Sequence, residues 1–514
     1  METALKQRLL TGASLAVAVV AGWQIAHESL FLAVFVGSLL LVWLARRLLQ
    51  VPADALVAGG VLVGYLVGNR GFAQLHTPGL PLLPAEAALG LGVGLAIWRS
   101  ARTRVLPVQR DSLNMLLVAW LVVGAARLRS DFAAHGFLAL RDFAMLYYGL
   151  FFFLAQHWST DAAARRWVER CLTIGFALTA PVFLAFSRWP DFFVAHFTVM
   201  GTPVIFVKSD VAGGFMVAGV FWFLVKHGQR GKLLWLVLAG TNLIGVVLSN
   251  SRAALVALGV VCIWLTACRD WRRLRPVAAM AATGLLALLI VAAVNGKPWT
   301  QSAAYRLYES TASIVDFTGT KSYISADLED KPDNNQFRTT WWQAVIAETW
   351  ENGRWLGLGF GHDLADQFTR VYYAEGSEEF ATRSPHNFPL TVLGRMGMVG
   401  LALLIALLAM IGGRTWQAGR DAVQGRTDGA NFSLWLGAWA IFTGACFGVV
   451  LEGPMGAVVF WTMLGLANAS IAAEREPGDA DDAIGATAAV STSADSPAAP
   501  LPNVGTAVLL QRAP

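Results

Sequence analysis

The sequence predicts an all-α polytopic membrane protein, and three observations support this fold class. Of the 514 residues, 56% are hydrophobic and 14% are charged, and the mean hydropathy is +0.53, which is too apolar for a soluble globular protein of this size. Apolar runs of about 20 residues, enough to cross a bilayer as a helix, recur along most of the chain. These runs lack the strand-like alternation of apolar and polar residues, so a helical bundle is favoured over a barrel.

The apolar runs predict a bundle of about 12 to 14 transmembrane helices, divided by one large polar loop. Residues 1–295 hold the N-terminal helices, 296–386 form the loop, and 387–472 hold the C-terminal helices. Residues 473–514, rich in Ala, Asp, Ser, Thr and Pro, predict a disordered cytoplasmic tail. The predicted spans lie near 9–26, 29–45, 54–68, 81–98, 112–127, 142–157, 171–187, 211–226, 233–250, 253–267, 277–295, 387–412, 432–450 and 455–472.

Basic residues mark one side of the predicted bundle. The loops on this side, which alternate along the chain with those on the other side, carry about 20 basic residues in total. The short loops on the opposite side carry about 7, and such an excess is typical of the cytoplasmic side. Both termini are therefore expected in the cytoplasm and the large loop outside. The net charge of +5 reflects this asymmetry and gives no indication of a nucleic-acid partner. The clusters are Arg46-Arg47, Arg99 with Arg102 and Arg104, Arg165-Arg166, Lys226 with Arg230 and Lys232, and Arg269 with Arg272, Arg273 and Arg275.

The large loop contains two predicted helices. Between Thr339 and Glu351 apolar residues recur at helical spacing, which predicts an amphipathic helix on the bundle or on the membrane surface. A second helix is predicted to begin near Asp363, after the alternating glycines of residues 357–361. Those glycines leave backbone N–H groups approachable, which fits an anion site, and a tight turn without a ligand explains them equally well.

The loop closes on a histidine, in the run Ser384-Pro385-His386-Asn387, where the chain re-enters the bilayer. A histidine at that boundary indicates a site at the membrane surface, because imidazole titrates close to neutral pH. A second candidate, Arg252, stands on the four-residue hairpin that ends at it, on the same predicted side. Its guanidinium either snorkels to lipid headgroups or grips a diphosphate through its planar fork.

Further ionisable residues gather at the outer ends of the predicted spans, whereas the middle of the spans is almost free of charge. This distribution argues against a proton-coupled transporter, which needs ionisable groups near the bilayer centre. The further candidates are Arg141 with Asp142, Lys208 with Asp210, Arg395 and Glu452.

The cysteines give no indication of a metal centre. Cys171, Cys262, Cys268 and Cys446 all fall in or beside predicted spans, and the large loop contains none. We therefore expect neither a disulfide framework nor a zinc site, and the sequence suggests no cofactor.

Several motifs, taken in order, resemble the O-antigen ligase superfamily, which also includes polysaccharide polymerases and protein O-oligosaccharyltransferases. The resemblance covers about residues 250–465, and the N-terminal half agrees only in general pattern. The motifs are Ser249-Asn250-Ser251-Arg252-Ala253-Ala254, the large loop with Arg338 and Trp341-Trp342, Gly357-Leu358-Gly359-Phe360-Gly361, His386-Asn387-Phe388-Pro389-Leu390, and Gly394-Arg395-Met396-Gly397-Met398-Val399-Gly400.

The resemblance implies a GT-C-like bundle and a metal-independent, inverting glycosyltransferase of the bacterial inner membrane, whose active site faces the periplasm. The donor would be a glycan on undecaprenyl diphosphate. His386 matches the family's essential histidine, which acts as general base on the acceptor hydroxyl or positions it, and Arg252 matches the arginine that binds the donor diphosphate.

The sequence departs from the family pattern at a second diphosphate-binding arginine. Lys208 stands nearest to its usual place, and lysine neutralises phosphate without bidentate geometry. Arg141 or Arg338 are the other candidates for this role. Glu452, Arg395 and Asn387 are candidates for supporting the site, with Glu452 orienting a basic partner, placing the acceptor, or serving only as an interfacial carboxylate.

The chemistry of the two principal residues agrees with these roles. A sugar hydroxyl loses its proton as it attacks the anomeric carbon, and a histidine base contributes about 100- to 10,000-fold to such a step. The departing lipid diphosphate gains negative charge, which a fixed guanidinium stabilises more in the transition state than in the ground state.

Three acceptors remain open at this point: lipid A core for a ligase, a growing polysaccharide for a polymerase, and a protein hydroxyl. A polysaccharide exporter or flippase is the alternative from another class. An exporter should line its interior with polar groups at several depths, whereas here they gather at the outer rim. The lipid bilayer is the remaining expected partner.

Overall fold

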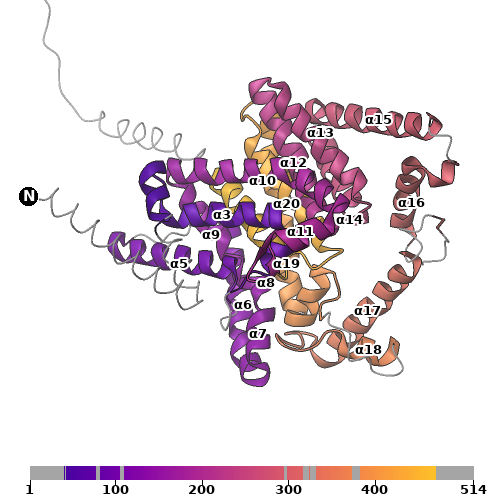
Figure 1. Ribbon diagram of the computed structural model, residues 1–514. Coiled ribbons are helices and arrows are strands. Elements are labelled where there is room, and N and C mark those ends of the chain that lie inside the picture. The colour runs from indigo at the N-terminus through magenta and orange to yellow at the C-terminus, as the bar shows by residue number, and fades with distance from the viewer. Residues whose placement is uncertain are drawn as a thin grey trace, which may run out of the picture. The chain divides into compact units, whose positions relative to one another are not determined.

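The computed structural model describes residues 40, 42–76, 82–104, 109–294, 298–316, 323–324, 331–372 and 383–470, and this part of the chain is predominantly helical (Figure 1). The fold is an all-α polytopic membrane protein, as predicted. The tail 473–514 and the predicted span 9–26 lie outside the described residues, as does most of the span 29–45.

The N-terminal block runs from α3 to a small hairpin. The segment Phe137–Ser159 acts as one broken span made of α7, α8 and α9. The elements are α3 (Ala53–Gly68), α4 (Arg70–Ala73), α5 (Pro84–Thr103), α6 (Ser112–His135), α7 (Phe137–Asp142), α8 (Ala144–Tyr147), α9 (Leu150–Ser159), α10 (Ala162–Arg188), α11 (Pro190–His196), β1 (Thr198–Val199) and β2 (Thr202–Pro203). The two strands pair antiparallel.

The second block carries four helices, the loop region and the last spans. Its elements are α12 (Ser209–Arg230), α13 (Leu233–Leu248), α14 (Arg252–Ala267), α15 (Trp271–Val294), η1 (Trp299–Gln301), α16 (Ala303–Val315), α17 (Lys331–Asn352), α18 (Asp366–Tyr372), α19 (Phe388–Val423), α20 (Ala430–Ala445) and a last helix over 454–470.

Short polar side chains begin several of these helices. Asp111 accepts hydrogen bonds from the backbone N–H groups of Leu113 and Asn114 at the start of α6. Ser251 caps α14 and Asn387 caps α19 in the same way. Each cap satisfies N–H groups that have no partner inside the helix. The caps of α14 and α19 thus fix the residues beside them, Arg252 and His386.

The predicted spans from 54–68 onward each coincide with a helix or with the broken span. Six of the described helices are long and apolar enough to cross a membrane, and a seventh is added if Val42–Leu49 and α3, bent by 108°, count as one span. The predicted 12 to 14 include spans outside the described residues, and α13, α14 and α20 are further apolar helices of 16 residues each. The six are Ser112–His135, Phe137–Ser159, Ala162–Arg188, Ser209–Arg230, Trp271–Val294 and Phe388–Val423.

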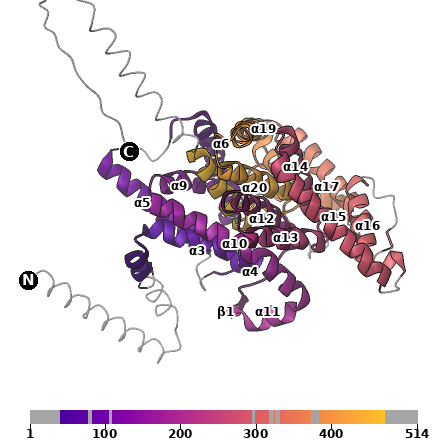
Figure 2. The same cartoon turned by 90° about the horizontal axis from the view of Figure 1, so that it is seen from above.

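The centre of the bundle is α12. Its side chains are buried without interruption from Val211 to Val225, and α10, α13, α14 and α20 surround it (Figure 2). A helix buried on every side is expected to be apolar all round. Close packing depends on small residues: a Cβ on Gly213 would lie 2.5 Å from the Cβ of Ala254 on α14.

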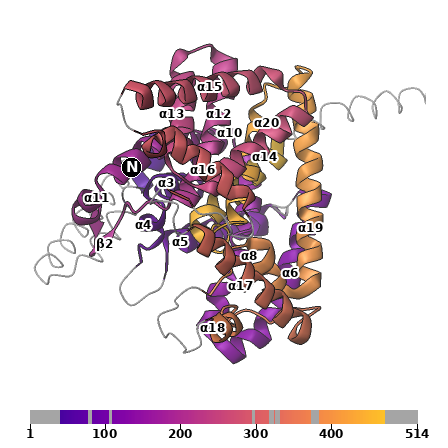
Figure 3. The ribbon, with the colours of Figure 1, turned by 90° about the vertical axis from the view of Figure 1, so that its right-hand side faces the viewer.

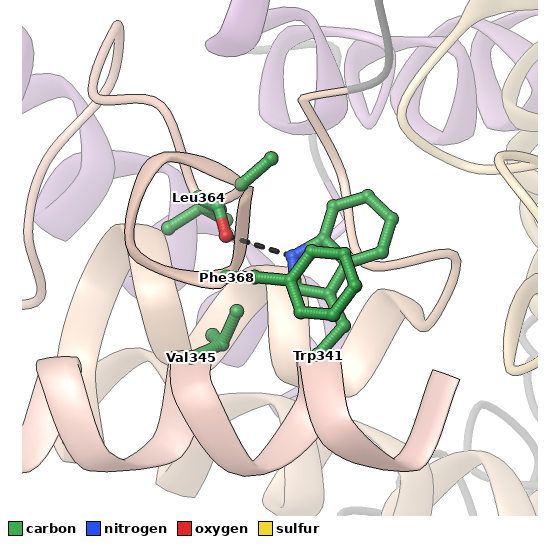
Figure 4. Close-up of a cluster of buried hydrophobic side chains, with 5 residues drawn as sticks. Trp341, Val345, Leu364 and Phe368 are labelled. Atoms are coloured by element: carbon green, nitrogen blue, oxygen red, sulfur yellow. Dashed lines mark hydrogen bonds between the residues drawn. The ribbon is translucent and has the colours of Figure 1, made fainter. Parts of the chain in front are cut away.

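The large loop folds onto the bundle through α17. This helix begins eight residues before the predicted Thr339 and ends at Asn352, and it packs on α18 and α19 (Figure 3). The Trp341 ring stacks on Phe368 at 5.3 Å between centroids, and its Nε1 donates to the Leu364 carbonyl at 2.8 Å (Figure 4). A fully buried tryptophan with its N–H satisfied anchors the loop.

Candidate functional site

Two cavities meet at Lys208, the residue before α12. The first, of about 500 Å³, is called the arginine cavity, and the second, of about 340 Å³, is called the histidine cavity. The arginine cavity is lined by Lys208, Ser209, Asp210, Asn250, Ser251, Arg252, Ala253, Val256, Ser313, Ile314, Asn335, Arg338, Thr339, Trp342 and Phe447. The histidine cavity is lined by Arg70, Arg141, Asp142, Met145, Lys208, Arg383, Ser384, His386, Thr391, Arg395, Val449, Glu452 and Met455.

Arg252 and Arg338 line the arginine cavity from two different helices. Arg252 begins α14, and its Nη1 donates to Asn335 Oδ1 at 2.6 Å and to the Ser313 carbonyl at 3.4 Å. Arg338, on α17, donates to the Phe447 carbonyl at 2.9 Å. Within the described ranges neither guanidinium forms an ion pair with a carboxylate. Two cations held by neutral oxygens leave positive charge available for an anionic ligand.

The two arginines are close enough to repel each other. Burial and then the charge of Arg252 lower the pKa of Arg338, and Asp210 opposes both effects. The group remains a cation at neutral pH, because the ordinary pKa of arginine is so high. A bound anion would relieve this repulsion.

Lys208 joins the two cavities and is fixed through its backbone. Its N–H donates to Asn69 Oδ1 at 3.0 Å, and its ammonium lies 3.7 Å from Asp210 Oδ2. The ion pair is partly exposed, so water weakens it. Lys208 therefore stands where a ligand could contact both cavities at once.

His386 lies half-buried at the wall of the histidine cavity, in a left-handed backbone conformation with φ of 52°. Such a conformation is uncommon for residues other than glycine and is often found at functional sites. The preceding carbonyl, of Pro385, accepts from Trp342 Nε1 at 2.8 Å, and the His386 ring meets the edge of Trp341 at 5.9 Å. Two tryptophans of α17 thus hold the histidine in place.

The electrostatic environment keeps His386 neutral. Burial, Arg338 and Lys208, in that order, lower the pKa of His386 to about 4, and Asp210 raises it. At neutral pH the ring therefore carries one unprotonated nitrogen, which is free to accept a proton or a hydrogen bond.

Glu452 braces the segment that carries His386. Its Oε1 accepts from Ser384 Oγ at 3.0 Å and from Thr391 Oγ1 at 3.1 Å, on either side of the histidine. Its Oε2 is buried and has no hydrogen-bond partner among the described residues. Burial raises the pKa of Glu452 to about 7, against the lowering effect of these hydrogen bonds. The carboxyl group therefore changes charge near neutral pH.

Arg395 is a structural residue at the back of the histidine cavity. It is 2% exposed and pairs with Asp142 at 2.8 Å, and its Nη1 also donates to the carbonyls of Gly359 and His362. A buried cation with this many partners has little capacity left for a ligand.

The glycine turn is filled by the chain itself. The N–H of Phe360 donates to Asp131 Oδ2 at 2.8 Å, and that of Gly361 to Asp142 Oδ2 at 3.0 Å. These two backbone N–H groups are therefore already paired with carboxylates of the chain itself. The glycines form a turn whose hydrogen bonds are satisfied without an external anion. The predicted second helix begins at Asp366, three residues after Asp363.

The remaining predicted residues separate. Arg141 is exposed and lines the histidine cavity, away from Arg252. Asn387 lines neither cavity, and its Oδ1 accepts from the Leu390 N–H as a helix cap. Sequence reasoning missed Arg70 and Arg383 in the histidine cavity and Asn335 beside Arg252, and no local pattern distinguishes them.

Among the residues that the structure describes, no group of three or more His, Cys, Asp or Glu side chains is arranged to hold a metal ion.

Residues 235–405 match the family described as O-antigen ligase. The matched region runs from α13 into α19 and contains Arg252, Arg338 and His386. No curated protein sequence matches the chain. Members of this family are glycosyltransferase-like membrane enzymes, so the resemblance seen in the motifs is confirmed. Residues 235–405 of this multi-pass membrane protein are therefore similar to the O-antigen ligase family.

Proposed function

We propose that this chain transfers a glycan from undecaprenyl diphosphate to an acceptor hydroxyl at the periplasmic face of the bacterial inner membrane, as an O-antigen ligase does. One observation carries the proposal. Arg252 and Arg338 line one cavity, His386 lines the next, and Lys208 lines both, although these residues come from four separate segments of the chain.

The arginine cavity suits the diphosphate of the donor. Arg252 and Arg338 offer planar forks that match phosphate oxygens, and Lys208 adds a point charge toward the histidine cavity. As the bond between the sugar and the diphosphate breaks, negative charge grows on the leaving oxygen. Fixed cations stabilise that charge without needing to reorganise.

The histidine cavity suits the acceptor. The acceptor oxygen forms the new bond to the anomeric carbon while its proton passes to the unprotonated ring nitrogen of His386. The diphosphate departs with the electron pair of the broken bond. Attack from the side opposite the leaving group inverts the anomeric carbon, and the step needs no cofactor.

Donor binding should strengthen the base. Arg338 and Lys208 both lower the pKa of His386, and a diphosphate beside them would cancel part of their charge. The pKa of His386 would then rise from about 4 toward its ordinary value. The histidine would therefore accept the proton of the acceptor hydroxyl more readily when the donor is bound than when it is absent.

The position of the site supports a periplasmic orientation. The cavities lie at the N-terminal end of α12, whose 22 residues reach about 33 Å at about 1.5 Å per residue. The opposite end of α12 meets a third cavity, lined by Arg269, Arg272 and Arg273 from a predicted cytoplasmic loop. The basic loop and the proposed site thus belong to opposite ends of one spanning helix.

The test uses purified protein in liposomes with an undecaprenyl diphosphate-linked glycan and a chelator. We expect His386→Ala to lower transfer at least about 100-fold. His362→Ala is the matched control, because His362 lies in the same loop but pairs with Glu348 at 2.8 Å. Full transfer by a folded His386→Ala variant, or a requirement for a divalent ion, would contradict the proposal.

Deleting the gene in its host separates the acceptors. Long polymers retained on the carrier lipid indicate a ligase. Single repeat units on the carrier indicate a polymerase instead.

A further inference from the structure

Residues 189–206, called here the aromatic arm, connect α10 to α12 through α11 and the β1–β2 hairpin. No residue of the arm is buried, although most of it is apolar. Asp191 and His196 are its only titratable residues. The exposed large apolar side chains are Trp189 (58%), Phe192 (50%), Val194 (36%), Phe197 (43%), Val199 (50%), Met200 (53%) and Phe206 (36%).

The arm is ordered by its own contacts. Phe193 stacks on Phe197 at 5.4 Å, and Phe192 meets the edge of Phe197 at 5.7 Å. Its base is pinned to the start of α4, because the Gly71 N–H donates to the Phe206 carbonyl at 3.2 Å and Arg70 lies over the Phe206 ring. An ordered segment that exposes this many aromatic side chains needs an apolar partner.

The neighbours of the arm identify that partner. Both α10 and α12 are long and apolar enough to cross a membrane, so the arm begins and ends where two spans leave the bilayer. Figure 2 shows α11 and β1 standing off from the helices around α12. Tryptophan and phenylalanine side chains are favoured at the boundary between headgroups and acyl chains.

We propose that the aromatic arm lies in the bilayer interface, with lipid acyl chains as its partner, on the side onto which the arginine and histidine cavities open. The side follows from Lys208, which stands two residues beyond the arm and lines both cavities. Arg70, at the base of the arm, lines the histidine cavity as well. The arm would thus hold the proposed site at the level of the lipid headgroups.

The test places one fluorescent label at a time on the full chain, with the native Cys171, Cys262, Cys268 and Cys446 replaced by alanine. Met200→Cys reports on the arm. Ile263→Cys, 67% exposed on the apolar helix α14, is the lipid-facing reference, and Glu351→Cys, exposed at the end of α17, is the aqueous reference. The protein is placed in phosphatidylcholine vesicles, and quenching by a headgroup-level nitroxide lipid is compared with quenching by aqueous iodide.

We expect the label at Met200 to be quenched several-fold more by the nitroxide lipid than the label at Glu351, and several-fold less by iodide. Equal values at Met200 and Glu351 would overturn the proposal. The measurement involves no glycan transfer, so its result is independent of the proposed enzyme activity.

Substitutions in the arm provide the second measurement. Phe192→Asp combined with Phe197→Asp should shift the Met200 label several-fold toward the aqueous reference. Thr198→Asp is the matched control, since Thr198 lies in the same arm, on β1, and its side chain is exposed but polar. Lipid quenching that is unaffected by the double substitution, or reduced equally by Thr198→Asp, would contradict an apolar contact with lipid.

Discussion

Arg252 on α14 donates a hydrogen bond of 2.6 Å to Asn335 on α17, across 83 residues of sequence. Asn335 in turn donates through Nδ2 to the Asp316 carbonyl at 2.6 Å. The loop therefore holds the side-chain amide of Asn335, and that amide holds the Arg252 guanidinium. The large loop is therefore part of the proposed diphosphate site, because it sets the direction of the Arg252 guanidinium.

Replacing Asn335 should weaken use of the donor. Asn335→Ala leaves Arg252 without its shortest hydrogen bond, and a bond to a charged group contributes about 1.5–3 kcal/mol, so kcat/KM for the donor should fall about 10-fold or more. Steady-state kinetics in liposomes measure the effect. Thr340→Ala is the control, because that hydroxyl bonds only the backbone of its own helix. A loss of the same size in both variants would indicate a general effect on α17.

The pH dependence of transfer should report the charges around His386. The pKa of His386 is about 4, so kcat/KM, which reflects the free enzyme, should lose its histidine-dependent part only as the pH falls through about 4. Arg338→Gln removes a positive charge that opposes protonation, so this acid limb should move to higher pH while the maximal rate falls. If the acid limb of Arg338→Gln stayed at the same pH, the charge of Arg338 would not be what lowers the pKa of His386.

Local patterns predicted most of the helices. Hydropathy over about 20 residues, proline and glycine breaks, and polar caps such as Asp111 act within a few residues, so the sequence displays them directly. The same patterns predicted α13 and α14, which are apolar helices of 16 residues each. The family motifs predicted a site that contains Arg252 and His386, and this stays a prediction; Arg252 lines the arginine cavity and His386 lines the histidine cavity.

Contacts across long stretches of chain were not predictable in this way. The carboxylates that fill the glycine turn, Asp131 and Asp142, come from 229 and 219 residues earlier in the sequence than the amides they accept from. Asn69, which accepts from the Lys208 N–H, is 139 residues away. A hydrogen bond between distant segments depends on how the helices pack, and hydropathy carries no information about that register.

Protonation of Glu452 should make stability depend on pH. Its folded-state pKa of about 7 lies above the ordinary value of 4.5, so the folded protein binds this proton more tightly than the unfolded chain. The resulting stability is complete below about pH 4.5 and is lost as the pH rises through about 7, a loss of about 3 kcal/mol at most. Glu452→Gln cannot ionise and should lack this loss.

Thermal unfolding in detergent, followed by tryptophan fluorescence, checks the prediction. Between pH 5 and pH 8 the unfolding temperature of the native protein should fall more than that of Glu452→Gln. Because each protein is compared with itself at the two pH values, any effect of the substitution on stability that does not depend on pH cancels. Parallel curves for the two proteins would mean that Glu452 is already ionised throughout this range.

Gly359 should tolerate no side chain. Its φ is 98°, and a Cβ there would lie 2.7 Å from Asp131 Oδ1, the carboxylate that also accepts from the Phe360 N–H. Gly359→Ala therefore adds a clash to backbone strain of about 1–2 kcal/mol, and it should displace Asp131 from the turn. Gly136→Ala is the matched control, since its φ is 58° but no atom lies within 4 Å of the added Cβ. The unfolding temperature should fall clearly further in Gly359→Ala than in Gly136→Ala. Glycan transfer should fall as well, because the Gly359 carbonyl accepts a hydrogen bond from Arg395 in the histidine cavity. Equal losses in the two variants would show that backbone conformation alone, without the carboxylate, decides the requirement for glycine.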